Sequence, residues 1–100
     1  MPLMRFVKKD IVKDYAAAVD WTSDAQDISK VEFIGVYVKV CAATTISLLV
    51  ETTQGYIEYD TMDFSATGEN FWNIWSFPFE NIKFKTSAAV TLTLQLFIKT

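Results

Sequence analysis

Carboxylates are the side chains of this sequence that come nearest to catalytic chemistry. Glu58, Asp60 and Asp63 cluster in one short stretch. Glycoside hydrolysis needs two carboxylates across a cleft, roughly 5–10 Å apart, and Glu58 and Asp60 are expected to share one strand face about 7 Å apart. Alternating acids on an exposed strand face are, however, ordinary solvated surface. We therefore predict that the protein is not an enzyme.

Other catalytic equipment is missing from the sequence. The chain has no histidine, which removes the commonest general base and the usual protease triads. Its three glycines stand far apart, so no phosphate-binding loop is formed. The single cysteine, Cys41, excludes an internal disulfide and indicates a reducing compartment. Because Cys41 ends an apolar run, we expect it to be a buried small hydrophobe.

A second acidic group, Asp20, Asp24 and Asp27, lies in and just before the polar stretch Trp21–Asp27, which reads as a loop. Clustered loop oxygens suit a hard cation such as calcium. The stretch lacks the glycine and the terminal glutamate of an EF-hand loop. We predict no metal site and no cofactor, with calcium in this loop as an alternative that the sequence leaves open.

Length and composition describe one domain, residues 1–100, with more apolar residues than so small a domain hides easily. The hydrophobic fraction is 51%, whereas a domain of this size buries only roughly two-thirds of its unfolded surface. Part of the apolar surface is therefore expected to face a partner. The net charge of −3 and the absence of a basic stripe argue against nucleic acid. No stretch resembles a signal peptide or a membrane span, so we expect synthesis in the cytoplasm and no membrane partner.

Alternating apolar and polar residues predict strands along most of the chain. The pattern is strictest over Ala88–Lys99 and recurs over Thr45–Glu51 and Glu80–Thr86. Gln54-Gly55 is typical of a turn between two strands.

Two stretches are harder to interpret. The apolar parity reverses at Gly35 within residues 28–40, which predicts a β-bulge there. Residues 10–20 fit either a helix or a strand, and their β-rich surroundings favour a strand. The complete pattern gives seven or eight short strands, typical of a small antiparallel β-sandwich of jelly-roll-like type. Residues 1–27 are expected to belong to it as an N-terminal arm or an edge segment.

An aromatic segment, residues 68–85, raises the main functional question. As a strand it places Phe71, Trp75 and Phe77 on one face, and Trp72 with Ile74 on the other. Both faces are apolar, which leaves three interpretations: rings that are all in the core, a face covered by another protein, or a platform for a sugar ring or unpaired base.

The residues that we predict to bind a partner or ligand are Trp72, Trp75, Phe77, Phe79 and Trp21. They suit an assembly module that binds copies of itself or a larger assembly such as a capsid. The alternative is a carbohydrate-binding module that holds a glycan on exposed Trp and Tyr side chains. A binder of single-stranded nucleic acid is disfavoured by the acidic balance.

Residues 28–100 resemble, in style, the small β-sandwich accessory proteins of tailed-phage virions, such as decoration or head-fibre-associated proteins. The features that carry this resemblance are ISKVEFIGVYVKV, TTISLLVETTQGYIEY, FWNIWSFPFENIKFKT and AVTLTLQLFIKT. The resemblance implies a non-enzymatic virion component, present in many copies as a homo-oligomer or bound to capsid proteins. It implies no particular site residues.

Overall fold

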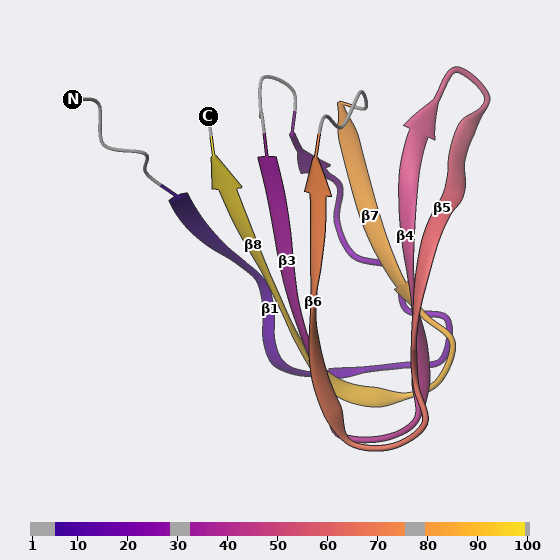
Figure 1. Cartoon of the computed structure of the whole chain (residues 1–100). Helices are drawn as coiled ribbons and strands as arrows, with labels where there is room; N and C mark the ends of the chain where they lie inside the picture. Colours follow the sequence, from indigo (N-terminus) through magenta and orange to yellow (C-terminus); the bar gives the residue numbers. More distant parts are fainter. Residues whose placement is uncertain (1–5, 29–32, 76–79, 100) are drawn as a thin grey trace.

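The computed structural model describes residues 6–28, 33–75 and 80–99, which form two facing antiparallel sheets of four strands (Figure 1). In chain order the strands are β1 (Phe6–Ala17), β2 (Gln26–Asp27), β3 (Phe33–Val40), β4 (Thr44–Thr52), β5 (Gly55–Phe64), β6 (Gly68–Trp75), β7 (Asn81–Thr86) and β8 (Val90–Lys99). The first sheet has the order β1-β8-β3-β6 and the second has the order β2-β7-β4-β5. A search of these residues finds no helix that is long and apolar enough to cross a membrane.

The strand order is that of a jelly roll. Within the sheets β1 pairs with β8, β2 with β7, β3 with β6, and β4 with β5. The chain therefore behaves as one long hairpin, closed by the β4–β5 turn, whose successive strand pairs alternate between two sheets. The predicted jelly-roll-like antiparallel sandwich of seven or eight strands is confirmed, with eight strands observed.

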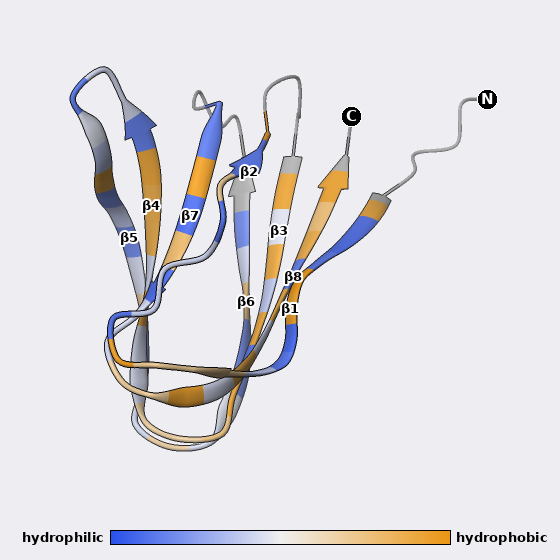
Figure 2. Ribbon diagram, turned by 180° about the vertical axis from the view of Figure 1, so that it is seen from behind, coloured by the Kyte–Doolittle hydropathy of each residue, from blue (hydrophilic) through white to orange (hydrophobic). Residues whose placement is uncertain are grey.

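The core lies between the two sheets and is built from one parity of each central strand. Ile46, Leu48 and Val50 of β4 are fully buried, as are Ile82 and Phe84 of β7. Leu92, Leu94 and Leu96 of β8 face them from the first sheet and are at most 1% exposed. Figure 2 shows the alternation as bands of hydrophobic and hydrophilic residues along β4 and β7. The strands predicted from alternation are confirmed, because inward residues alternate with outward ones along an extended chain.

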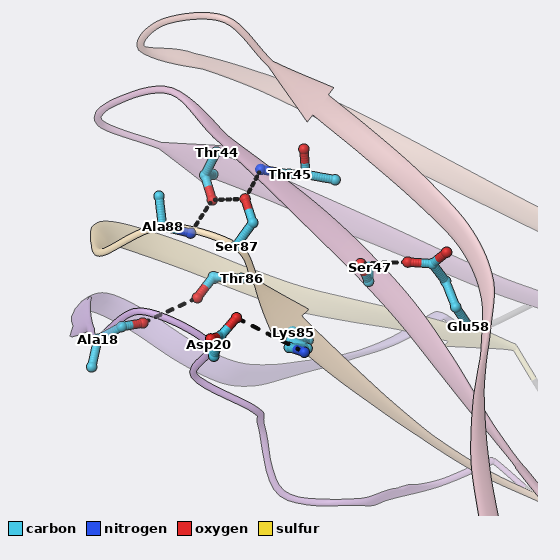
Figure 3. A network of polar contacts seen from close by, with 10 residues as sticks. All are labelled: Ala18, Asp20, Thr44, Thr45, Ser47, Glu58, Lys85, Thr86, Ser87 and Ala88. Atoms are coloured by element: carbon cyan, nitrogen blue, oxygen red, sulfur yellow. Dashed lines mark hydrogen bonds and ion pairs between the residues drawn. The ribbon is translucent and has the colours of Figure 1, made fainter.

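The stretch after β1 is more ordered than the predicted loop. The Ser23 amide donates to the Phe84 carbonyl at 2.8 Å, and the Thr86 amide donates to the Trp21 carbonyl at 2.9 Å. Further polar contacts join this stretch to β7, from Thr86 Oγ1 to the Ala18 carbonyl and between Lys85 and Asp20 (Figure 3). Residues 21–28 thus cover the edge of β7 that would otherwise be open to pairing with another strand.

Ser23 is the buried polar side chain at the centre of this contact. Its residue is 4% exposed, and its Oγ accepts from the Phe84 amide at 2.9 Å and donates to the Asp24 carbonyl at 3.0 Å. Ser23→Ala leaves a buried amide unpaired, so the free energy of unfolding should fall by about 1–3 kcal/mol. Urea denaturation measures this change. Ser47→Ala, on an outward-facing position of β4, is the matched control and should cost less than about 1 kcal/mol; equal effects would contradict the role of Ser23.

The bulge predicted at Gly35 is wrong. From Phe33 to Val40, β3 pairs without a register shift with both β6 and β8. Gly35 is buried and lies opposite Asn73 of β6 and Phe97 of β8. The apolar parity therefore reverses at Gly35 within a regular strand, without an inserted residue.

The irregularities of the first sheet lie in β1 instead. Its register with β8 shifts between Asp10 and Val12 and again between Val12 and Tyr15, and Asp14 has a φ of 48°. These shifts place Val12 opposite Leu94 and Tyr15 opposite Leu92. At each of the two shifts β1 has one residue more than β8. Apolar residues of β1 are therefore not spaced by a strict alternation, which explains why residues 10–20 fit either a helix or a strand. The preference for a strand is confirmed for residues 10–17, and residues 18–20 form a turn after the strand.

Cys41 is exposed, so the prediction of a buried thiol is wrong. The inward parity of β3 ends at Val40, which is 1% exposed, and the chain leaves the sheet at the next residue. The Cys41 sulfur accepts a hydrogen bond from the Thr91 amide at 3.2 Å. Cys41 continues the apolar run of β3, but because the strand ends at Val40, its side chain is not held in the core.

Candidate interaction surfaces

Trp72 lies in the core of this chain rather than on its surface. It points from β6 toward the second sheet and is 8% exposed. Its ring centroid is 6.2 Å from that of Phe84, and its Nε1 donates to Asp60 Oδ2 at 3.1 Å. Trp72 therefore links β6 of one sheet to β5 of the other, and this inward face of the aromatic segment is covered by the same chain.

The outward face of β6 is represented by Phe71, which is 40% exposed. Its ring contacts Phe97 and leaves the remaining surface open to solvent. The side chain of Trp75 and residues 76–79, with Phe77 and Phe79, lie outside the described residues. Their predicted binding roles stay predictions.

Glu58 and Asp60 do not share a face, which corrects the expectation from the sequence. Glu58 is opposite Leu49 and Asp60 is opposite Leu48, because the register of β5 shifts by one residue between them. Glu58 accepts from Ser47 Oγ at 3.0 Å on the outer surface (Figure 3), whereas Asp60 binds the core residue Trp72. These two carboxylates therefore do not form a pair across one cleft. Within the described ranges, no three Asp, Glu, Cys or His side chains gather into a metal-binding group.

The outer face of the first sheet also carries a hydrogen bond from the Tyr37 hydroxyl to Glu69 Oε2. This bond is the main cause that raises the pKa of Tyr37 above its ordinary value, with smaller contributions from desolvation and from the Glu69 charge. The folded phenol holds its proton more tightly than the unfolded one. The resulting stabilisation is fully present below the unfolded pKa of about 10 and is lost as pH rises through the higher folded pKa.

Tyr37→Phe should therefore reduce the loss of thermal stability in alkali. We expect Tm to fall more for the wild type than for Tyr37→Phe between about pH 9 and pH 11, measured by circular dichroism. Part of the fall should remain in the variant, because burial and Glu51 also raise the pKa of Tyr56. Equal falls in the two proteins would show that the Tyr37–Glu69 bond does not affect stability.

Trp21 lines a groove between β1 and the segment of residues 21–26. The groove has a volume of about 270 Å³, and Tyr15 and Gln26 contribute to its walls. The Tyr15 and Trp21 rings are 5.3 Å apart. Gln26 is 6% exposed, and its Oε1 has no hydrogen-bond partner among the described residues. The sequence pointed to Trp21 but not to Tyr15 or Gln26, although Tyr15 shares its parity with Trp21.

Two edge strands carry most of the exposed apolar surface. Among the described residues the exposed large hydrophobic side chains are Val7, Tyr15, Val19, Ile57, Tyr59 and Phe71. All but Phe71 belong to β1, to the turn that follows β1, or to β5. Sequence reasoning missed these positions because it sought binding residues among the tryptophans and phenylalanines.

The chain is similar to known proteins in structure but not in sequence. No protein-family model matches the chain, and no curated protein matches it in sequence. Among solved structures, the crystal structure of the SPBc2 prophage-derived protein YomS superposes with a TM-score of 0.66. The match covers 100% of this chain and 97% of that one, at 9% sequence identity. The chain therefore shares its whole fold with a prophage-derived protein.

Proposed function

We propose that the protein is a non-enzymatic structural component of a phage-type particle and acts through protein–protein contacts. The observation that carries this proposal is the match to the prophage-derived protein YomS, which spans nearly all of both chains. A match of this extent means that the similarity covers the whole sandwich and not a single sheet or hairpin.

The surface supports the same function. Jelly rolls serve in viral capsid proteins and in lectins, and a fold by itself does not decide between such roles. Among the described residues, most of the exposed large apolar side chains lie on the edge strands β1 and β5 or in the turn after β1. Gathered exposed apolar groups are typical of protein contacts, and this favours assembly.

Binding to particles tests the proposal. Purified chain is added to phage particles that lack it, obtained by deleting its gene from the phage or prophage that encodes it. We expect saturable binding, with the chain sedimenting together with the particles and a fixed number of copies bound at saturation. Chain that stays in the supernatant at every concentration would contradict the proposal. A β-sandwich of similar size from an unrelated source is the control for non-specific sedimentation.

A second function, carbohydrate binding, is favoured by the groove at Trp21. The groove contains the neighbouring rings of Tyr15 and Trp21, and a sugar presents an apolar ring face that packs on aromatic rings. Tryptophan emission titrated with soluble oligosaccharides tests this function. We expect a shift that Trp21→Ala abolishes without loss of folding, and a protein whose emission no glycan changes would exclude it.

A further inference from the structure

We propose that copies of this chain associate head to tail, with the β1 edge of one copy against the β5 edge of the next. This inference rests on the proposed function and deepens it by naming the first partner as a second copy. The two edges differ in sequence, position and charge, so the contact joins two different surfaces of the molecule.

The position of the edges follows from contacts within the sandwich. Trp72 of β6 reaches Asp60 of β5, so β6 and β5 share one side of the molecule. The groove at Trp21 lies between β1 and residues 21–26, which places β1 on the other side. Figure 1 shows β1 and β5 at opposite sides of the molecule. A contact between opposite, unlike surfaces is heterologous, and it builds a closed ring or an open filament.

Exposed apolar groups are present on both edges. Val7 and Tyr15 of β1 are 58% and 43% exposed, and Ile57 and Tyr59 of β5 are both 51% exposed. Val19, in the turn after β1, is 61% exposed. Contact between the edges would remove these side chains from water, and burial of apolar surface is the main favourable contribution to association.

The charges of the two edges are complementary. β5 carries Glu58, Asp60 and Asp63 and no basic residue. All three carboxylate residues are exposed.

On β1 the exposed Lys8, Lys9 and Lys13 outnumber Asp10 and Asp14, and Asp10 accepts a hydrogen bond from Gln95 at 2.7 Å. None of these lysines forms an ion pair with a described residue. Edge charges can also act to prevent aggregation between edges. For that role the two edges should carry the same sign of charge, so that they repel each other. Opposite signs attract one copy to the next and select which edges meet.

The contact is expected to be made by side chains more than by a continuous backbone ladder. The register shifts in β1, after Asp10 and after Val12, interrupt its regular edge. A shift between Leu48 and Leu49 of β4 likewise marks the bulge in β5. Bulged edges pair poorly with another strand. Charge reversal on the surface should therefore control association without disturbing the fold.

Complementary charge reversal tests the proposal by sedimentation velocity at low salt. Lys8→Glu/Lys13→Glu makes β1 acidic, and Glu58→Lys/Asp63→Lys makes β5 basic. Lys39→Glu, at an exposed position of the central strand β3, is the control for a change of charge away from both edges. Asp60 is left unchanged because it holds Trp72. Circular dichroism shows whether each variant is folded.

We expect the wild type and the Lys39→Glu control to associate as concentration rises. Each edge variant alone should associate at least about tenfold more weakly, since like charges then face each other. An equimolar mixture of the two edge variants should recover association, because acidic β1 then meets basic β5 and the two wild-type edges also meet. A wild type that stays monomeric, edge variants that associate normally, or a mixture that fails to recover would each overturn the proposal. A monomeric wild type that still binds particles would overturn this inference and leave the proposed function standing.

Discussion

Trp72→Ala is expected to lower the free energy of unfolding by about 3–5 kcal/mol, the range for removing a large buried aromatic side chain. Trp72 is 8% exposed and packs against Phe84, so its loss leaves a cavity between the two sheets. The loss also leaves Asp60 Oδ2 without its indole donor. The contact between β6 and β5 is then weakened on both counts.

Urea denaturation measures this change, and Trp72→Phe separates its two causes. Phenylalanine keeps most of the apolar contact and loses only the indole donor, so Trp72→Phe should cost markedly less than the alanine variant. The lost hydrogen bond alone is worth about 0.5–1.5 kcal/mol. An alanine variant as stable as the wild type would show that the Trp72 ring is not part of the core. It would also restore the interpretation of Trp72 as a surface platform.

Phe84→Ala is the second large expected effect, again about 3–5 kcal/mol. Phe84 is fully buried at the middle of β7, where its amide and carbonyl are both bonded to Ser23. The ring therefore supports the core at the strand that residues 21–28 cover. Phe84→Leu, which keeps an apolar side chain in place, is the control and should cost about 1–2 kcal/mol. A smaller loss for alanine than for leucine would contradict this packing.

A double-mutant cycle links the two positions. Because the rings of Trp72 and Phe84 are 6.2 Å apart, their effects should not add, and the coupling should be about 0.5–1.5 kcal/mol. The cycle compares unfolding free energies of Trp72→Leu, Phe84→Leu and the double variant, since leucine keeps each protein folded. Additive effects would show that the contact does not join the sheets.

The sequence predicted the regular strands well because one face of each is buried and the other is wet. Leu92, Leu94 and Leu96 alternate with polar residues, and all three are core residues. Prediction failed where pairing with distant strands decided the register, so that a change of local pattern did not mark a bulge or a bulge left no change of pattern. Gly35 lies in a strand that pairs regularly with both of its neighbours, and the bulge in β5 turns Glu58 and Asp60 to opposite faces. Both features depend on pairing between residues far apart in the chain, which the local alternation of apolar and polar residues does not record.

The candidate surfaces were less predictable than the fold. The parity of the aromatic segment correctly separated Phe71 from Trp72, but it did not show which face the second sheet covers. Tryptophan and phenylalanine drew attention as binding residues, whereas the exposed apolar groups include Val7 and Ile57 of the edge strands. Edges are defined by strand order, and strand order depends on pairings between residues far apart in the sequence.

The most direct test of the central claim, that this chain is a structural component of a phage-type particle, is its copy number in particles. Particles of the phage or prophage that encodes the chain are purified by density gradient, and quantitative mass spectrometry compares the chain with the major capsid protein. We predict that the chain bands with the particles at a constant, multiple copy number in every preparation. Particles that are free of the chain, while it is abundant in the lysate from which they were purified, would contradict the claim.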